Sequence, residues 1–169
     1  MAADKNGRNR GRTAPSTSMP LPDCVFCRRL RIRAGLDRWT VYEDEVFLAA
    51  HQVTETGPDP LGIVLVQTKR HVPDLASLTD AEAARLGLVL ARVSRALTAC
   101  TAAAWTYCFG FMEAYRHVHV VIASRHPDLP AEYVRLRFHE WPQGPHGGRA
   151  EVADLCRRLR AAIPRPPAL

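Results

Sequence analysis

The run RHVHVVIA, residues 116–123, alternates side chains in the pattern of a β-strand with one buried face. Side chains along a strand point to alternate faces, so His117, His119 and Val121 share one face. The other face, which we expect to enter the core, carries Val118, Val120 and Ile122. At a rise of about 3.3 Å per residue the two imidazoles lie about 7 Å apart, where they can bind metal or transfer protons.

Two cysteines, Cys24 and Cys27, have the C-x-x-C spacing of a zinc knuckle. His71 follows a predicted buried strand, at a point where a loop side chain can turn inward. With one histidine from His117 and His119, these residues make a Cys2His2 set, which is complete for tetrahedral zinc. The sequence therefore predicts a zinc centre that includes one of the two strand histidines.

Hydrophobic periodicity predicts an α+β fold with an antiparallel sheet of about five strands. The expected strands are 39–42, 46–50, 61–67, 105–111 and 117–123, with a weaker edge strand at 133–138. Thr79-Asp80-Ala81-Glu82 is a capping box, in which a hydroxyl and a carboxylate satisfy free N–H groups at a helix start. We expect one long helix from there to about Cys100, a loop at 141–148 and a C-terminal amphipathic helix at 151–163.

Length and composition favour one domain at residues 23–169, preceded by a disordered basic leader at residues 1–22. No stretch approaches the roughly 20 apolar residues of a membrane span, and the leader lacks the apolar region of a secretory signal, which favours a cytoplasmic protein. The five cysteines, an odd number, argue against a disulfide framework. The net charge of +6 is either a solvated surface or an attraction for a phosphate-bearing ligand, and no motif for specific nucleic-acid binding is present.

Four segments together resemble the histidine-triad (HIT) family, over residues 23–125. They are DCVFC at 23–27, VYEDEVFLAA at 41–50, GIVLVQTKRHVPDLASLT at 62–79 and HVHVVIASR at 117–125. The resemblance implies a homodimeric α+β fold of the HIT-like type. It also implies a mechanism in which a histidine attacks the α-phosphate of a nucleotide and a covalent nucleotidyl-histidine forms.

Residue by residue, the resemblance makes His119 the catalytic nucleophile. It implies that a structural, coordinatively closed zinc ion is held by Cys24, Cys27, His71 and His117. This choice of His117 agrees with the ligand count from spacing alone. The site would attach the N-terminal knuckle to the catalytic strand and orient His119.

The substrate pocket departs from the family pattern. Val121 occupies the third histidine position and cannot donate a hydrogen bond to phosphate. Glu113 and Tyr115 belong to the run 112–116, where relatives supply a small or hydroxyl residue beside the phosphate, and His51 and Gln52 lie where many place an acidic residue near the ribose. These five residues are the candidates for contact with the substrate.

Two classes of enzyme fit these observations, beside a non-catalytic binding module. The first is a HIT-like nucleotidyl hydrolase or transferase that works through His119. The second is an enzyme that keeps the zinc site but uses His119 as a general acid or base on a non-nucleotide small molecule.

Overall fold

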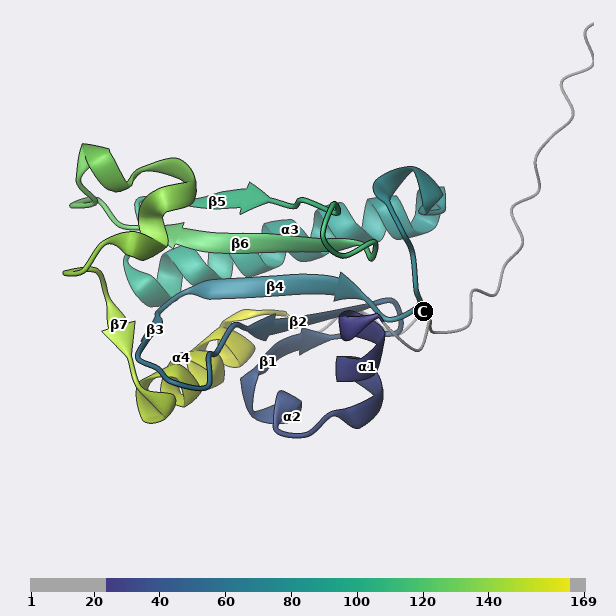
Figure 1. Cartoon of the computed structure of the whole chain (residues 1–169), viewed down its shortest axis with the longest axis horizontal. Helices are drawn as coiled ribbons and strands as arrows, with labels where there is room; N and C mark the ends of the chain where they lie inside the picture. Colours follow the sequence, from purple (N-terminus) through teal and green to yellow (C-terminus); the bar gives the residue numbers. More distant parts are fainter. Residues whose placement is uncertain (1–23, 165–169) are drawn as a thin grey trace, which may run out of the picture.

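The structure, a computed structural model, describes residues 24–164, so the predicted leader at 1–22 and both chain ends lie outside the described residues. Five strands form one antiparallel sheet in the spatial order β1-β2-β4-β6-β5, as shown in Figure 1. The strands are β1 (Thr40–Glu43), β2 (Phe47–His51), β4 (Ile63–Thr68), β5 (Trp105–Phe109) and β6 (His119–Arg125). The predicted α+β class and five-stranded sheet are confirmed.

Two helices cover one face of this sheet, α3 (Asp80–Thr101) and α4 (Arg149–Ala162). The capping box at the start of α3 is confirmed, because the Thr79 hydroxyl accepts from the Glu82 N–H while the Glu82 carboxylate accepts from the Thr79 N–H. The helix then buries a stripe at helical spacing, which packs on Val64, Val66 and Ile122 of the sheet. The buried residues of the stripe are Leu86, Val89, Val93, Ala96 and Leu97.

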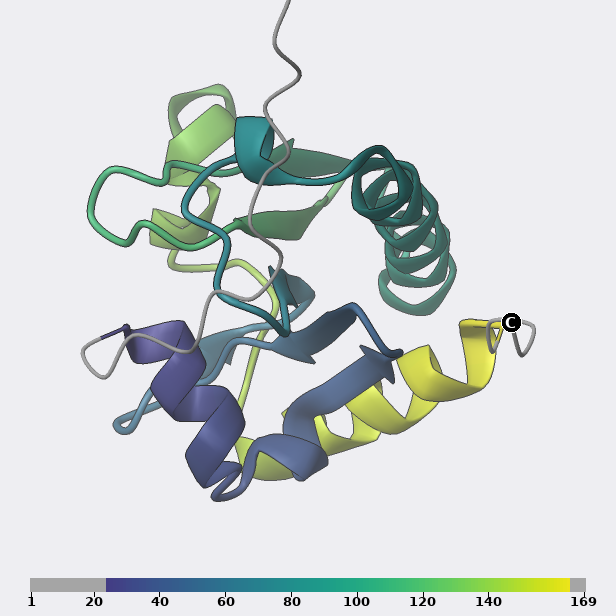
Figure 2. The same cartoon turned by 90° about the vertical axis from the view of Figure 1, so that its right-hand side faces the viewer.

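The opposite sheet face is only partly covered, by α1 (Val25–Ile32), while α2 (Leu36–Trp39) packs against α4 in the core. Figure 2 shows α1 on the other side of the sheet from α3. Residues paired directly across antiparallel strands share a face, and β4 pairs with β6 so that Gln67 opposes His119 and Leu65 opposes Val121. We call this surface the open face, and it holds the predicted nucleophile.

Three boundaries differ from the sequence prediction. The weak alternation at 133–138 does not form an edge strand, since these residues belong to two 3-10 turns, η2 (Ala131–Tyr133) and η3 (Arg135–Glu140). Within 141–148, residues His146–Gly147 form a short strand, β7, that pairs with β3 (Asp59–Pro60). Finally, β6 begins at His119 and not at His117, because the Val118 N–H donates to Val72 O outside the sheet ladder.

The remaining predicted elements lie close to their expected places, and η1 (Leu75–Ser77) adds one short turn before α3. No helix within residues 24–164 has the length and apolar character that crossing a membrane requires.

Candidate metal centre and active site

Four potential metal ligands converge at one end of the sheet. Cys24 and Cys27 lie at the start of α1, His71 in the loop after β4, and His117 two residues before β6. Their ligand atoms all lie within 4.8 Å of one another. The Nδ1 atom of His117 is 3.4 Å from the Cys24 sulfur and 3.6 Å from the Cys27 sulfur, and the Nδ1 atom of His71 is 3.4 Å from the Cys27 sulfur.

The backbone orients His117 for metal binding. Its Nε2 lies 2.9 Å from the carbonyl oxygen of Thr68, to which it donates in the tautomer that leaves Nδ1 facing the cysteines. A metal-binding histidine typically has such a carbonyl partner on its second nitrogen. Burial lowers the pKa of His117, which favours the neutral imidazole that a metal requires. The structure brings together the four residues predicted as ligands, and two thiolates with two neutral imidazoles form a donor set that fits zinc.

His119 has one occupied and one available ring nitrogen. Its Nδ1 lies 2.7 Å from the carbonyl oxygen of His117 and donates to it. In the neutral imidazole this hydrogen bond places the lone pair on Nε2, which is the form required of a nucleophile or a general base. The side chain is 9% exposed and therefore sits in a largely dry environment.

Phe26, between the two cysteines, covers His119. Its ring stacks on that of His119 with centroids 4.5 Å apart, and it lies 5.2 Å from the ring of His117. The ring of Tyr115 packs edge-on against the ring of Phe26, with the two centroids 5.8 Å apart. The metal knuckle thus also fixes the plane of the candidate nucleophile. The sequence shows an aromatic residue between the two cysteines, but the spacing alone could not predict that its ring would stack on His119.

Gln67 is a polar residue that the sequence analysis did not select. It is fully buried directly opposite His119, and its Nε2 donates to the Phe26 carbonyl oxygen at a long 3.4 Å. Its Oε1 is buried without a hydrogen-bond partner among residues 24–164. In the sequence, Gln67 could have been noticed as the only polar side chain of the otherwise apolar run LGIVLVQ.

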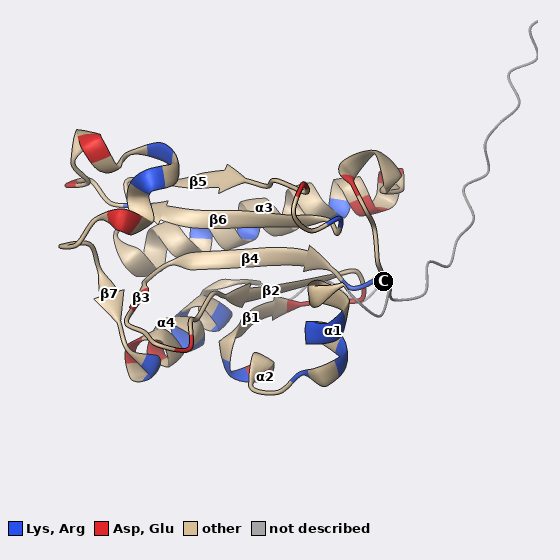
Figure 3. Ribbon diagram, in the orientation of Figure 1, with Lys and Arg blue, Asp and Glu red and all other residues tan. Residues whose placement is uncertain are grey.

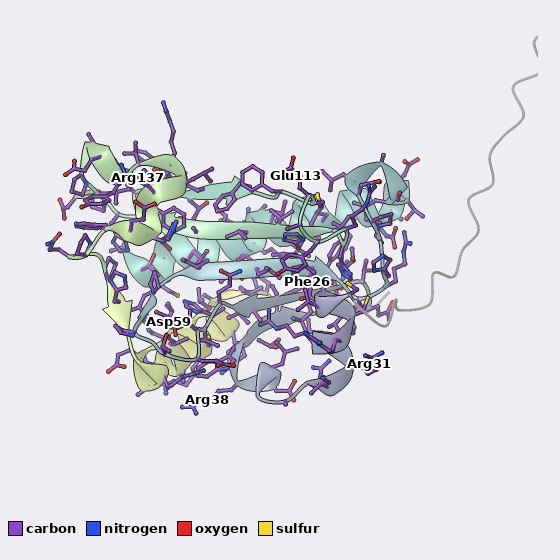
Figure 4. The ribbon with its side chains drawn as sticks, in the orientation of Figure 1. Phe26, Arg31, Arg38, Asp59, Glu113 and Arg137 are labelled. Atoms are coloured by element: carbon purple, nitrogen blue, oxygen red, sulfur yellow. The ribbon has the colours of Figure 1, made fainter. Side chains whose placement is uncertain are left out.

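The five predicted substrate contacts do not all lie together. Val121 is on the open face two residues from His119, and Tyr115 is near it through Phe26. Glu113 is exposed in the loop after β5, where Figure 4 labels it. His51 is fully buried, and both ring nitrogens bond to backbone, Nδ1 to Gln52 O and Nε2 to the Gly62 N–H. In this conformation His51 has no nitrogen available to a ligand.

Gln52 lies in a different place, on a cavity of about 610 Å³. The cavity is bordered by α1, α2, the segment between β2 and β4, and the start of α4. His119 is not among its described lining residues, but Ile63 is, and Ile63 pairs with Ala123 on β6. Ala123 is four positions from His119, so Ile63, on the border of the cavity, lies about 13 Å from His119 along one sheet face.

Comparison with solved structures gives the same fold, while no protein-family model and no curated protein matches the chain. A HIT-like protein involved in cell-cycle regulation from Bartonella henselae is similar at 18% identity and a TM-score of 0.62, over 83% of this chain and 97% of that one. A hypothetical histidine triad nucleotide-binding protein from Sulfolobus tokodaii is similar at 22% identity and 0.61, over 83% and 91%. A zinc-bound histidine triad family protein from Mycobacterium smegmatis is similar at 26% identity and 0.59, over 83% and 93%.

The fold of this chain is therefore the HIT fold, with a Cys2His2 centre at one end of its sheet. In this fold Val121 stands at the position that the sequence resemblance gives to the third histidine of the motif.

Proposed function

We propose that the protein is a nucleotidyl hydrolase or transferase that acts through His119. The observation that carries the proposal is the hydrogen bond from His119 Nδ1 to the His117 carbonyl, which leaves Nε2 as the nucleophilic atom. The HIT fold and the nucleotide-binding description of the Sulfolobus protein support a phosphate-bearing substrate.

In this proposal the Nε2 lone pair attacks the α-phosphorus of a bound nucleotide conjugate. A P–N bond forms, the bond from phosphorus to the leaving group breaks, and the leaving group departs with its electron pair and takes up a proton from solvent. A water or another acceptor then attacks the phosphorus, loses its proton to solvent and releases His119 in its starting form. The His117 carbonyl stabilises the positive charge on the imidazole during the intermediate.

Zinc is proposed to be structural. Four protein ligands complete a tetrahedral site and leave no open position for a substrate. When bound there, zinc would hold α1 against the start of β6 and so keep Phe26 stacked on His119. A homodimer, cytoplasmic location and the substrate contacts proposed for Gln52, Glu113, Tyr115 and Val121 remain part of this proposal.

The test is to incubate the zinc-loaded protein with adenosine 5'-phosphoramidate and to look for a nucleotidyl adduct by intact mass and for turnover. We expect both to disappear in His119→Ala and to persist in the matched control His146→Ala, whose ring lies on β7. Absence of adduct, turnover and nucleotide binding, with one zinc per chain, would refute the nucleotidyl mechanism.

A second candidate is acid–base chemistry at His119 on a non-nucleotide substrate. It is favoured by Val121, which offers no hydrogen-bond donor beside the nucleophile. Turnover of a non-nucleotide substrate that needs His119 but forms no covalent adduct would select this candidate.

A further inference from the structure

One cationic side chain on the wall of the cavity that Gln52 lines, that of Arg29, has no partner among the described residues. Arg29 borders the cavity, and its guanidinium makes no hydrogen bond or ion pair within the described part of the chain. By contrast Arg33, the residue that caps the C-terminus of α1, forms ion pairs with both Glu43 and Asp37. Figure 3 shows the concentration of Lys and Arg on α1 in front of a sheet whose strands β4 and β6 carry few charges.

Arg29 is partly buried, and its burial lowers its pKa, although the group stays charged at neutral pH. Its guanidinium is partly shielded from water and has no described partner, so an anion bound there gains more free energy than one bound at a fully exposed cation. Arg31, on the exposed side of α1, lacks this shielding.

Other groups on the cavity wall suit an anionic ligand. Arg149 lies at its rim, where α4 begins without a side-chain cap, and donates to Thr54 O at 2.7 Å. Trp39 supplies a flat, mostly buried surface, with the Arg149 guanidinium 5.5 Å from its ring centroid. Two carboxylates also line the cavity, but Asp59 is buried and accepts from the Thr54 N–H, and Glu55 is exposed.

One surface joins this cavity to His119. The open face runs from His119 past Val121 and Leu65 to Ile63, which lines the cavity. Helix α1 follows the same path, because Phe26 stacks on His119 and Arg29, three residues later, lies on the same side of the helix. Figure 4 shows Phe26 and Asp59 toward opposite ends of this face.

We propose that the cavity is a second subsite, in which Arg29 binds an anionic group of the substrate remote from the reacting phosphate. The inference rests on the proposed function, and it makes the substrate doubly anionic: a phosphate at His119 and a second phosphate or carboxylate in the cavity, whose border at Ile63 is about 13 Å away along the sheet. That span is comparable to the length of a mononucleotide. The apolar side chains between the two ends, Val121 and Leu65, then face the uncharged middle of the ligand.

The experiment compares three probes by calorimetry on the zinc-loaded protein. AMP carries one anionic group, adenosine 3',5'-bisphosphate adds a phosphate on the ribose, and adenylosuccinate adds carboxylates on the base. We expect at least one doubly anionic probe to bind about tenfold more tightly than AMP, the effect of one charge-assisted contact. Which of the two binds more tightly identifies phosphate or carboxylate as the second group.

Arg29→Gln should abolish this preference and leave the Kd of AMP within about twofold. The matched control Arg31→Gln removes the same charge from the exposed side of α1 and should keep the preference. Equal affinity of all three probes for the wild type, or an equal loss for AMP and the other probes in Arg29→Gln, would overturn the proposal.

A second measurement separates this inference from the nucleotidyl mechanism. Inorganic phosphate should raise the melting temperature of the wild type and of His119→Ala but not of Arg29→Gln. If no nucleotide binds, the proposed function fails, while this pattern would still support the anion subsite. Stabilisation that survives Arg29→Gln and disappears in His119→Ala would instead overturn it.

Discussion

Removal of zinc should release α1 while the rest of the fold stays intact. The helix has eight residues, fewer than the 12 to 15 or so at which an isolated helix is even marginal, and Cys24 at its N-cap makes no side-chain cap. Ordering eight backbone residues costs about 8–16 kcal/mol. Without zinc, packing and hydrogen bonds must offset this cost alone.

The packing and hydrogen bonds of α1 contribute about as much free energy as the ordering of its backbone costs. Burial of Phe26 contributes about 1.5–3 kcal/mol, and the partly buried Leu30 somewhat less. The helical hydrogen bonds and the bond from Gln67 to Phe26 O contribute about 1 kcal/mol each, or about 5 in all. The ion pair of Arg33 with Glu43 adds at most about 1 kcal/mol. The sum is about 8–10 kcal/mol, so the roughly 10 kcal/mol of a structural zinc site decides whether α1 is ordered.

The assay is amide hydrogen exchange followed by mass spectrometry, before and after zinc is removed by chelation. We expect peptides of α1 to lose protection within seconds to minutes, while peptides of α3 remain protected because the core beneath them is untouched. Cys27→Ser should reproduce the loss without chelator, and Cys108→Ser, at an exposed cysteine on β5, should not. Protection of α1 that survives in the metal-free protein would refute the reasoning, as would simultaneous loss of protection in α3.

Three further predictions concern residues around the site. Arg33 and then Lys69 lower the pKa of Glu43 from 4.5 to about 2, so its carboxylate stabilises the fold above about pH 4.5 and this stabilisation is lost as the pH falls toward 2. Glu43→Gln should therefore lower the free energy of unfolding by about 1 kcal/mol at pH 7, after screening at the half-exposed cations, and by less in acid, as measured by urea titration. Gln67→Met removes a buried unpartnered oxygen and should leave stability unchanged or raise it by about 1 kcal/mol in the same assay. Trp105 is 51% exposed on edge strand β5, and Trp105→Glu should convert the proposed homodimer to monomer by light scattering.

Each of these predictions has a contrary result. An effect of Glu43→Gln that is constant from pH 7 to pH 3 would mean that the carboxylate does not carry the stabilisation. A loss of 2 kcal/mol or more in Gln67→Met would show that the amide is satisfied in solution. A wild type that is already monomeric at micromolar concentration would remove the homodimer from the proposal.

The parts of the fold that depend on local patterns could be predicted from the sequence. The capping box Thr79–Glu82 fixes the start of α3 because its hydrogen bonds join residues three apart. The apolar run before Gln67 became β4 for a similar reason, since a buried strand needs only a continuous apolar segment. The four metal ligands could be selected because ligand type and C-x-x-C spacing restrict the choices.

Features that depend on register between distant segments could not be predicted. The opposition of Gln67 and His119 follows from the pairing of β4 with β6, which no periodicity within either strand defines. The start of β6 depends on a hydrogen bond from Val118 to Val72, 46 residues earlier. The position of Arg29 at the cavity was hidden for the same reason: in the sequence it is one of four arginines within residues 28–33, and only packing distinguishes it from Arg31.

Three residues of the short helix α1 have separate places in the site: Cys27 belongs to the candidate metal site, Phe26 covers the proposed nucleophile, and Arg29 borders the cavity. The first two require fixed chemistry, whereas a change at position 29 alters neither the ligand set nor the stacked ring. Under the proposed function, mutation at that one position can therefore change which molecules the protein accepts while His119 and the candidate metal ligands are kept. A lineage of such proteins would diversify in substrate through a single turn of helix, and position 29 is where a library designed to redirect this scaffold should begin.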